Sequence, residues 1–238
     1  MPETAPNINP VPSLRSLSTM FAIASVFAIV GGFLDAYSYL ARGHVFANAQ
    51  TGNVVLFGVR AAAGDWASAW KTLPPIFAYL FGVAVARLLR VRPQKHTFRA
   101  TLICQALELF VLLVLLFFGG FVPDFCAVPL IAFSAALQNT SFSNVGPWQF
   151  NSAMTTANLR NAVSGWLQLA LGETDPTLRG KAIVGSVISL CFAAGALLGG
   201  VCTLRLLAFP LLPVVVLAAA GTLLTVRERQ RYRAGIPL

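Results

Sequence analysis

Long apolar runs separated by short polar segments make up most of the chain. The runs are long enough, at about 1.5 Å rise per residue, to cross a hydrocarbon core of roughly 30 Å as helices. They are residues 20–40, 73–89, 102–122, 125–143, 183–204 and 206–226. Two shorter amphipathic segments, 53–70 and 156–171, follow the first and the fourth run. The pattern predicts six transmembrane helices plus two short re-entrant or interfacial helices.

The composition is that of a membrane protein. Hydrophobic residues make up 57% of the chain and charged residues 11%, with a mean hydropathy of +0.74, whereas soluble domains carry about 25% charged residues. The formal net charge of +9 does not indicate nucleic acid, because membrane proteins collect Lys and Arg in their cytoplasmic loops. We therefore expect the lipid bilayer, and no nucleic acid, as a partner of this chain.

The positions of the basic residues distinguish six spans from eight. If the two short segments do not cross the membrane, both termini are cytoplasmic and 13 of the 17 Lys and Arg residues lie on the cytoplasmic side. If both segments cross, the basic residues divide almost evenly, and Arg60 and Arg160 fall within the bilayer. The positive-inside bias favours six spans. The sequence therefore predicts an all-α, multi-pass bundle with both termini in the cytoplasm.

Two polar segments between the apolar runs repeat one another. Residues 51–53 (Thr-Gly-Asn) return as residues 156–158 (Thr-Ala-Asn) after 105 positions, and Asp35 corresponds to Asn139 at an offset of 104. Two landmarks that keep nearly the same offset indicate an internal duplication. Because each half holds three spans, the second copy would sit upside down relative to the first. This inverted 3+3 repeat is the architecture of many secondary transporters.

The duplication divides the chain into four parts. Residues 19–122 and 123–226 are predicted to be the two three-span repeats. Residues 1–18, which include four prolines, are expected to form a disordered cytoplasmic tail. Residues 227–238 are predicted to be a basic cytoplasmic tail.

The two polar segments are the predicted binding site. In an inverted repeat they would meet near the midplane, where irregular backbone is tolerated only if it is buried in protein or lines a cavity. A helix starting at Asn53 or Asn158 would present free amides and a positive dipole end to a ligand. The alternative is that these residues only cap two interfacial helices. The predicted substrate-binding residues are Asp35, Asn48, Gln50, Thr51, Gly52, Asn53, Gln138, Asn139, Thr155, Thr156 and Asn158.

Two acidic residues, Asp35 and Glu108, fall inside predicted spans. A lone carboxylate in hydrocarbon costs about 2.5 to 3.5 kcal/mol on insertion scales, so such a residue usually faces a partner or a water-filled path. Both residues are therefore candidates for proton coupling. The structural alternative is a salt bridge, of Asp35 with Arg42 or Arg60 and of Glu108 with Arg87.

The sequence contains no pattern typical of an enzyme or a metal site. It lacks a glycine-rich phosphate loop and a nucleophile elbow. His44 and His96 lie 52 residues apart in different loops, which is not a metal-ligand spacing. The four cysteines lie in apolar sequence without a C-x-x-C pair. We expect no catalysis, no cofactor and no metal.

The stretch GGFLDAYSYLARGHVFANAQTGNVVLFG, with the later ANLRNAV, resembles the YoaK family of small bacterial membrane proteins. The resemblance covers essentially the whole membrane-embedded region and implies a six-span protein of the bacterial inner membrane. It implies no particular substrate. The second half departs from the T-G-N-L-R that the resemblance leads us to expect, because Ala157 replaces the glycine. This weakens the case for a left-handed backbone there.

Together these observations predict a small secondary transporter or permease for a polar solute or ion, with proton coupling through Asp35 as a further hypothesis. The alternative is a non-transporting membrane scaffold or regulatory protein, which needs no substrate. Small residues at 193–196 and 199–200 would allow close helix packing within one chain or in a homo-oligomer.

Overall fold

The structure is a computed structural model that describes residues 14–90, 97–141, 143–206 and 209–234. It is helical almost throughout, which confirms the predicted all-α class; the exception is a hairpin of two-residue strands that pairs Asn144 with Gln149. The elements in chain order are α1 (Leu14–Ala41), α2 (Gln50–Ala62), α3 (Trp66–Trp70), α4 (Leu73–Arg90), α5 (Thr97–Phe118), α6 (Asp124–Ser141), β1 (Asn144–Val145), β2 (Trp148–Gln149), α7 (Thr156–Ala170), α8 (Thr177–Arg205) and α9 (Leu212–Arg233).

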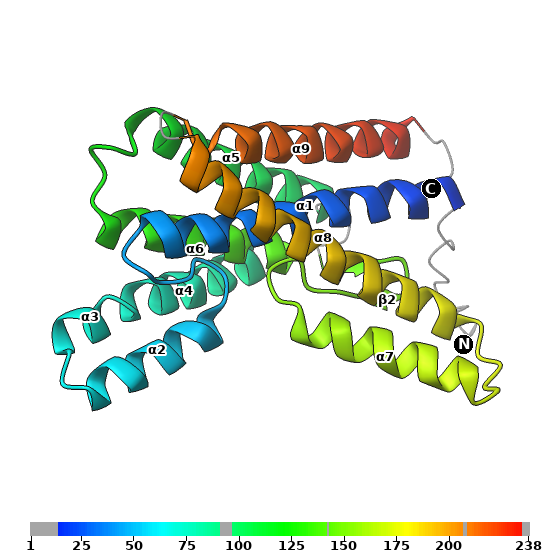
Figure 1. Ribbon diagram of the computed structural model, residues 1–238. Coiled ribbons are helices and arrows are strands. Elements are labelled where there is room, and N and C mark those ends of the chain that lie inside the picture. The colour runs from blue at the N-terminus through cyan, green and yellow to red at the C-terminus, as the bar shows by residue number, and fades with distance from the viewer. Residues whose placement is uncertain (1–13, 91–96, 142, 207–208, 235–238) are drawn as a thin grey trace, which may run out of the picture.

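The long helices form a bundle with the short helices on one side (Figure 1). Helix α1 packs along α8, and α4 packs along α6. Helix α5 contacts both α6 and α9, and α9 returns to α1. Helices α2 and α7 lie on the same side of the bundle and run from its middle towards opposite ends (Figure 1).

The largest hydrophobic core lies between α1, α5, α6 and α9. It includes the fully buried side chains Phe27, Phe33, Leu112, Ile131 and Val214. Each large apolar side chain removed from water contributes roughly 1.5 to 3 kcal/mol in a soluble protein, but lipid is as apolar as leucine. Close packing between these helices therefore has to supply their association.

Glycines set the close contact between α1 and α8. A Cβ atom at Gly199 would lie 2.6 Å from the carbonyl oxygen of Phe33, and one at Gly195 would collide with the carbonyl oxygen of Ile29. The small residues of α8 therefore serve packing inside one chain. The predicted homo-oligomer stays a prediction.

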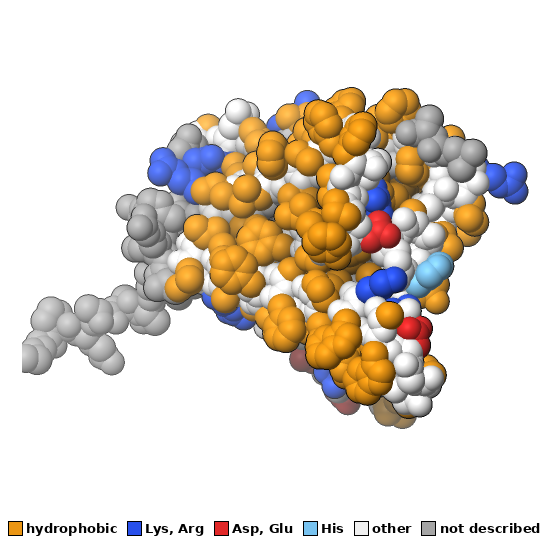
Figure 2. Space-filling model, turned by 90° about the vertical axis from the view of Figure 1, so that its left-hand side faces the viewer, with side chains coloured by type: hydrophobic (Ala, Val, Ile, Leu, Met, Phe, Trp, Pro, Cys, Tyr) orange, Lys and Arg blue, Asp and Glu red, His pale blue; other side chains and the backbone are white. Residues whose placement is uncertain are grey.

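The outside of the bundle is largely apolar. Within the described part of the chain, four helical segments are long and apolar enough to cross a membrane: Leu17–Ala41, Trp66–Leu89, Arg99–Phe118 and Thr177–Arg205. Figure 2 views the end of the molecule that lies on the left in Figure 1, and hydrophobic side chains cover most of it. Helices α2 and α7 also expose large apolar side chains, among them Val54, Val59, Val163 and Leu167.

Several element boundaries differ from the sequence pattern. Helix α1 begins at Leu14, inside the predicted disordered tail 1–18, and α9 continues to Arg233 through the predicted basic tail. The predicted short helix 53–70 is two helices, because Gly64 adopts a φ of 78° and Asp65 caps α3. Residues 1–13, 91–96 (with Arg92 and Lys95) and 235–238 lie outside the described residues.

Candidate functional site

Two asparagines hold the polar segments in the same way. Asn53 Oδ1 accepts a hydrogen bond from the backbone N–H of Phe46 at 2.8 Å, and Asn53 Nδ2 donates to the carbonyl oxygen of the same residue at 2.8 Å. Asn158 Oδ1 accepts from the N–H of Asn151 at 3.0 Å, and its Nδ2 donates to the carbonyl oxygen of Asn151 at 2.6 Å. In each copy the asparagine binds both backbone groups of the residue seven positions earlier. We call this arrangement the asparagine clamp.

A second pair of contacts follows the same correspondence. Asp35 Oδ1 accepts from the backbone N–H of Asn48 at 2.7 Å, and Asn139 Oδ1 accepts from the N–H of Ser152 at 3.3 Å. In both cases 13 residues separate the partners. A carboxylate oxygen in the first copy and a neutral amide oxygen in the second thus accept the same backbone hydrogen bond.

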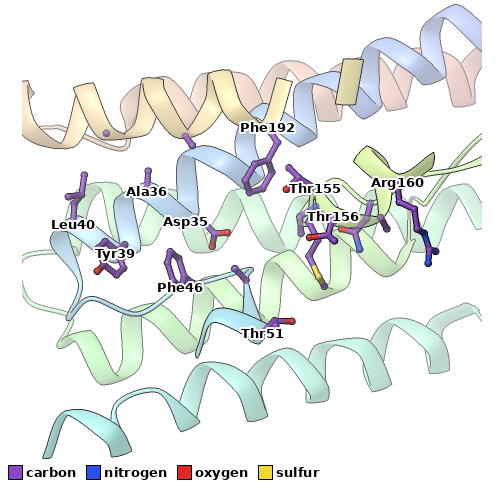
Figure 3. Close-up of a pocket in the computed structure, with 17 residues that line it drawn as sticks. Asp35, Ala36, Tyr39, Leu40, Phe46, Thr51, Thr155, Thr156, Arg160 and Phe192 are labelled. Atoms are coloured by element: carbon purple, nitrogen blue, oxygen red, sulfur yellow. Dashed lines mark hydrogen bonds between the residues drawn. The ribbon is translucent and has the colours of Figure 1, made fainter. Parts of the chain in front are cut away.

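A cavity of about 850 Å³ lies between the two polar segments. Helices α1 and α8 form one part of its wall, and the first residues of α2 and α7 form another (Figure 3). In the close-up, Asp35 lies between Phe46 and the Thr155–Thr156 pair. The residues on the wall are Asp35, Ala36, Tyr39, Leu40, Phe46, Ala49, Thr51, Asn151, Ala153, Met154, Thr155, Thr156, Ala157, Arg160, Phe192, Ala196 and Gly200.

The predicted site residues divide into two groups. Asp35, Thr51, Thr155 and Thr156 line the cavity. The others lie outside the wall and hold the segments that form it. Asn53 and Asn158 do so through their clamps. Gln50 donates to the carbonyl oxygen of Ala47, and Asn48 donates to that of Gly31. Gln138 and Asn139 form hydrogen bonds with Ser152. Gly52 allows the Phe46 ring to approach, because a Cβ atom there would lie 2.9 Å from the ring.

Both short helices begin at the cavity without a side-chain cap. Helix α2 follows Ala49 and helix α7 follows Thr155, and neither residue makes a side-chain capping hydrogen bond. The asparagines are therefore not helix caps, and the helices begin before them, at Gln50 and Thr156. The first turn of a helix carries unpaired amides and a partial positive charge. The start of α7 thus makes its part of the cavity wall attractive to an anionic group. The segment before α2 already donates a backbone N–H, that of Asn48, to the Asp35 carboxylate.

Sequence reasoning did not select several residues of the wall. The sequence pattern uses Arg160 only in the count of basic residues on each side of the membrane, although Arg160 follows Thr156 by four positions and so shares its helix face. Tyr39 is related to Asp35 by the same spacing. A spacing of four residues from a predicted site residue could have identified these positions. The spacing alone does not select them, because a residue on a membrane helix can have it whether its side chain faces a cavity or lipid.

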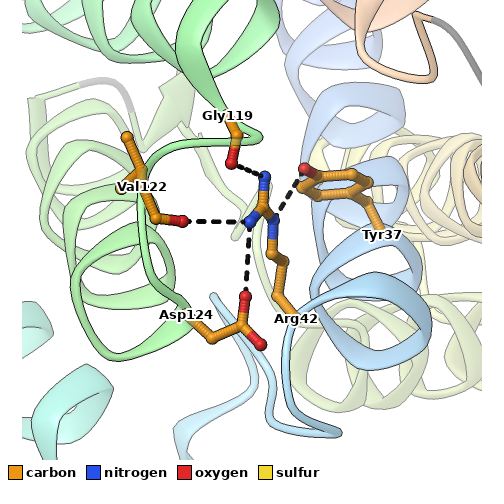
Figure 4. Close-up of polar contacts among 5 residues, drawn as sticks. All are labelled: Tyr37, Arg42, Gly119, Val122 and Asp124. Carbon is orange, nitrogen blue, oxygen red and sulfur yellow. Dashed lines mark hydrogen bonds and ion pairs between the residues drawn. The ribbon is translucent and has the colours of Figure 1, made fainter.

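The predicted salt-bridge partners of Asp35 are engaged elsewhere. Arg42 forms an ion pair with Asp124 at 3.3 Å and also donates to Tyr37 and to the carbonyl oxygens of Gly119 and Val122 (Figure 4). Burial opposes the charge of Arg42, but Tyr37 and Asp124 hold its pKa above the usual value. Arg42 therefore joins the end of α1 to the turn between α5 and α6.

Arg60, the other predicted partner of Asp35, donates to the carbonyl oxygens of Ser68 and His44. Among the described residues, the structure pairs neither Arg42 nor Arg60 with Asp35.

Glu108 is buried away from the cavity wall. It is 2% exposed, and Gln105, one turn earlier on α5, is 1% exposed. Within the described part of the chain, Glu108 Oε2 and both amide atoms of Gln105 have no hydrogen-bond partner, and Arg87 forms no ion pair with Glu108. A third acidic group, Glu228, is also buried and lies 3.7 Å from Arg231. The predicted basic cytoplasmic tail, residues 227–238, includes Glu228.

A family model described as a protein of unknown function (DUF1275) matches residues 23–224. The chain belongs to the DUF1275 family. This DUF1275 chain is also 29% identical over 174 residues to the UPF0700 transmembrane protein YoaK of Bacillus subtilis (strain 168), an alignment that covers 68% of this chain and 77% of that protein. No solved structure matches the chain.

The comparisons confirm the YoaK-like resemblance and, with the long apolar helices, the assignment of this DUF1275 chain as a membrane protein. The matched region contains the cavity and both asparagine clamps. The name of the relative states that it is a transmembrane protein and assigns it no substrate.

Proposed function

We propose that this DUF1275 protein is a small secondary transporter or permease that moves a polar solute through the cavity between its two polar segments. The observation that carries the proposal is the cavity of about 850 Å³, which has residues of both segments on its wall. Binding sites for small molecules are concave, mostly apolar and supplied with a few polar groups. A scaffold or regulatory protein needs neither the cavity nor the two uncapped helix starts.

The proposal includes an inverted 3+3 repeat with six spans, in the bacterial inner membrane, with both termini in the cytoplasm. In support, α1 packs along α8 as α6 packs along α4, and α9 packs on α1 as α5 packs on α6. These pairs are equivalent if α1, α4 and α5 correspond to α6, α8 and α9. The spans then include α6 and α9, which are 18 and 22 residues long, lengths that fit a hydrocarbon core.

Helices α2 and α7 are then re-entrant half-helices. Both start at the cavity and run towards opposite ends of the bundle (Figure 1). Their outward side chains are apolar, as at Val59 and Val163, which are 62% and 66% exposed. Such side chains fit a helix surrounded by lipid tails. Irregular backbone before each helix is tolerated at this depth because the clamps satisfy part of its hydrogen bonding and the rest lines the cavity.

Asp35 is the proposed coupling residue. It lies on the cavity wall, 6% exposed, whereas Glu108 lies outside that wall. A carboxyl group that exchanges a proton next to the substrate can link proton and solute binding. The matching residue, Asn139, cannot titrate, so coupling through this pair would involve one proton.

The proposal is tested by uptake into proteoliposomes. Vesicles with the full chain are exposed, under an imposed pH gradient, to a defined mixture of amino acids, sugars, organic acids and nucleosides, and their contents are analysed by mass spectrometry. The cavity-filling variant Thr156→Trp should abolish any uptake, while the matched control Val163→Trp, on the outer face of α7, should not. If wild-type vesicles accumulate nothing beyond the Thr156→Trp vesicles, the scaffold alternative is preferred.

A further inference from the structure

The cavity wall carries one acidic and one basic side chain, Asp35 on α1 and Arg160 on α7. The ion pairs between described residues join Arg42 to Asp124 and Arg231 to Glu228. Asp35 and Arg160 therefore do not neutralise each other across the cavity. Among the described residues neither side chain forms an ion pair with any other charged group, although Asp35 Oδ1 accepts the backbone N–H of Asn48.

Asp35 is the acidic group of the cavity wall. It is 6% exposed, and its Oδ1 accepts the backbone N–H of Asn48 at 2.7 Å. Asn48 itself is fully buried behind the wall, and its Oδ1 has no hydrogen-bond partner among the described residues. An ammonium group carries three N–H donors and a positive charge. It would therefore complement the Asp35 carboxylate.

The Arg160 end has the opposite character. Thr155, Thr156 and Ala157 bring the uncapped first turn of α7 to the wall, and Arg160 follows one turn later. Backbone amides, a hydroxyl group and a guanidinium together favour a carboxylate, which accepts charge-assisted hydrogen bonds. The two ends of one cavity thus attract opposite charges.

The wall also carries aromatic rings, with Phe46 on the far side of Asp35 from the Thr155–Thr156 pair (Figure 3). The rings of Tyr39 and Phe46 stack at 5.0 Å between centroids, and Phe192 approaches from α8 (Figure 3). Apolar and aromatic side chains bind well against such a surface.

We propose that the cavity takes a zwitterionic solute of the amino-acid type, with an apolar side chain. Its ammonium group lies at Asp35, its carboxylate at the first turn of α7 with Arg160, and its side chain against Tyr39, Phe46 and Phe192. This inference rests on the proposed function, since it names the solute class of the proposed transport site.

A matched series of probes tests the charge assignment. The purified full chain is titrated calorimetrically with L-phenylalanine, phenethylamine and 3-phenylpropionate, which share one ring and differ in their charged groups. Because a hydrogen bond to a charged group contributes about 1.5 to 3 kcal/mol, phenylalanine should bind at least about tenfold more tightly than either analogue.

Two variants should remove this preference one end at a time. Asp35→Asn should weaken phenylalanine to the affinity of 3-phenylpropionate, and Arg160→Gln should weaken it to that of phenethylamine. The controls Asp175→Asn and Arg179→Gln change exposed charges outside the cavity wall and should leave all three affinities unchanged. Equal binding of phenylalanine and one analogue, or no binding of any probe, would overturn the zwitterion assignment.

Binding and uptake separate the two proposals. If the uptake screen identifies a solute without paired opposite charges while phenylalanine does not bind, the transporter stands and the zwitterion assignment falls. If phenylalanine binds with the expected dependence on Asp35 and Arg160 but no solute accumulates in vesicles, the ligand assignment stands and the transport proposal falls.

Discussion

Asn53 and Asn158 make the same pair of hydrogen bonds, each to both backbone groups of the residue seven positions earlier. The two residues lie 105 positions apart, and each follows a threonine by two positions. Each side-chain amide replaces the partner that a neighbouring strand would offer to an exposed backbone. The clamps thereby allow two irregular segments to enter the bundle and to begin a helix at the cavity.

Removal of either clamp should destabilise the protein. Asn53→Ala or Asn158→Ala leaves a partly buried backbone N–H and a partly buried carbonyl group unpaired, and an unpaired group that is fully buried costs about 1 to 3 kcal/mol. We expect a lower unfolding midpoint in detergent for both variants, by similar amounts. Asn161→Ala, a half-buried position on the same helix as Asn158, is the control. A midpoint for the clamp variants equal to that of the control would show that the clamps contribute little.

Substitution of Asp35 by asparagine should preserve the fold and remove proton coupling. Asn139 makes the equivalent backbone contact with a neutral amide oxygen, so Asp35→Asn can keep the hydrogen bond from Asn48. We expect a membrane-inserted protein with a wild-type unfolding midpoint, and solute uptake that no longer responds to an imposed pH gradient. Unchanged pH-driven uptake would assign the coupling to another group, with Glu108→Gln as the next variant to measure.

The α1–α8 contact should not tolerate a side chain at Gly195. A Cβ atom there would collide with the carbonyl oxygen of Ile29, whereas one at Gly200, on the same helix, would meet its nearest neighbour at 3.9 Å. Overpacking of this kind costs about 1 to 3 kcal/mol. Gly195→Ala should therefore lower the unfolding midpoint, and Gly200→Ala should not. Equal effects of the two substitutions would argue against close contact of these backbones.

The carboxylate of Asp65 should titrate below its usual range. Ser68 hydrogen-bonds to it at the start of α3, and this interaction holds its pKa below the ordinary 3.8. Because the folded-state pKa is depressed, the contribution of Asp65 to stability is present above 3.8 and is lost as the pH falls through the folded value. A carbon-13 NMR titration of the carboxyl group measures this directly. Ser68→Ala removes the hydroxyl group but keeps the backbone N–H that donates to Asp65, so it should return the midpoint part of the way towards 3.8. A wild-type midpoint at 3.8 or higher would contradict the hydrogen bond.

The sequence predicted the helical bundle and the position of the site because both depend on local patterns. Long apolar runs required helices, and the repeated Thr/Asn segments marked both sides of the cavity. The sequence did not predict that the asparagines bind backbone groups. A side-chain amide that binds a ligand and one that binds the backbone can have the same residue type and the same spacing. Helices α2 and α7 begin at Gln50 and Thr156, before the asparagines at which the sequence analysis places their starts. These boundaries depend on backbone contacts of the preceding segments, which the sequence pattern does not show.

Arg160 and Glu228 show a second limit of sequence reasoning. The count of basic residues places Arg160 on one side of the membrane, and the end of the last apolar run places Glu228 in the predicted tail. Neither observation gives the direction of a side chain. The neighbours that make Arg160 part of the cavity, such as Phe192, come from a helix about 30 residues away. Helix packing decides such contacts, and no short pattern in the sequence encodes it.

The central claim is that both polar segments line one aqueous cavity. We would test it by introducing Thr51→Cys and Thr156→Cys singly into a chain without its four native cysteines, and by labelling oriented vesicles from each face with a hydrophilic maleimide. The account predicts that both positions label through a shared pathway, that phenylalanine protects both, and that Val54→Cys, on the outer face of α2, stays unlabelled. Labelling of Thr51→Cys only from the outside and of Thr156→Cys only from the inside, without protection, would contradict the shared cavity.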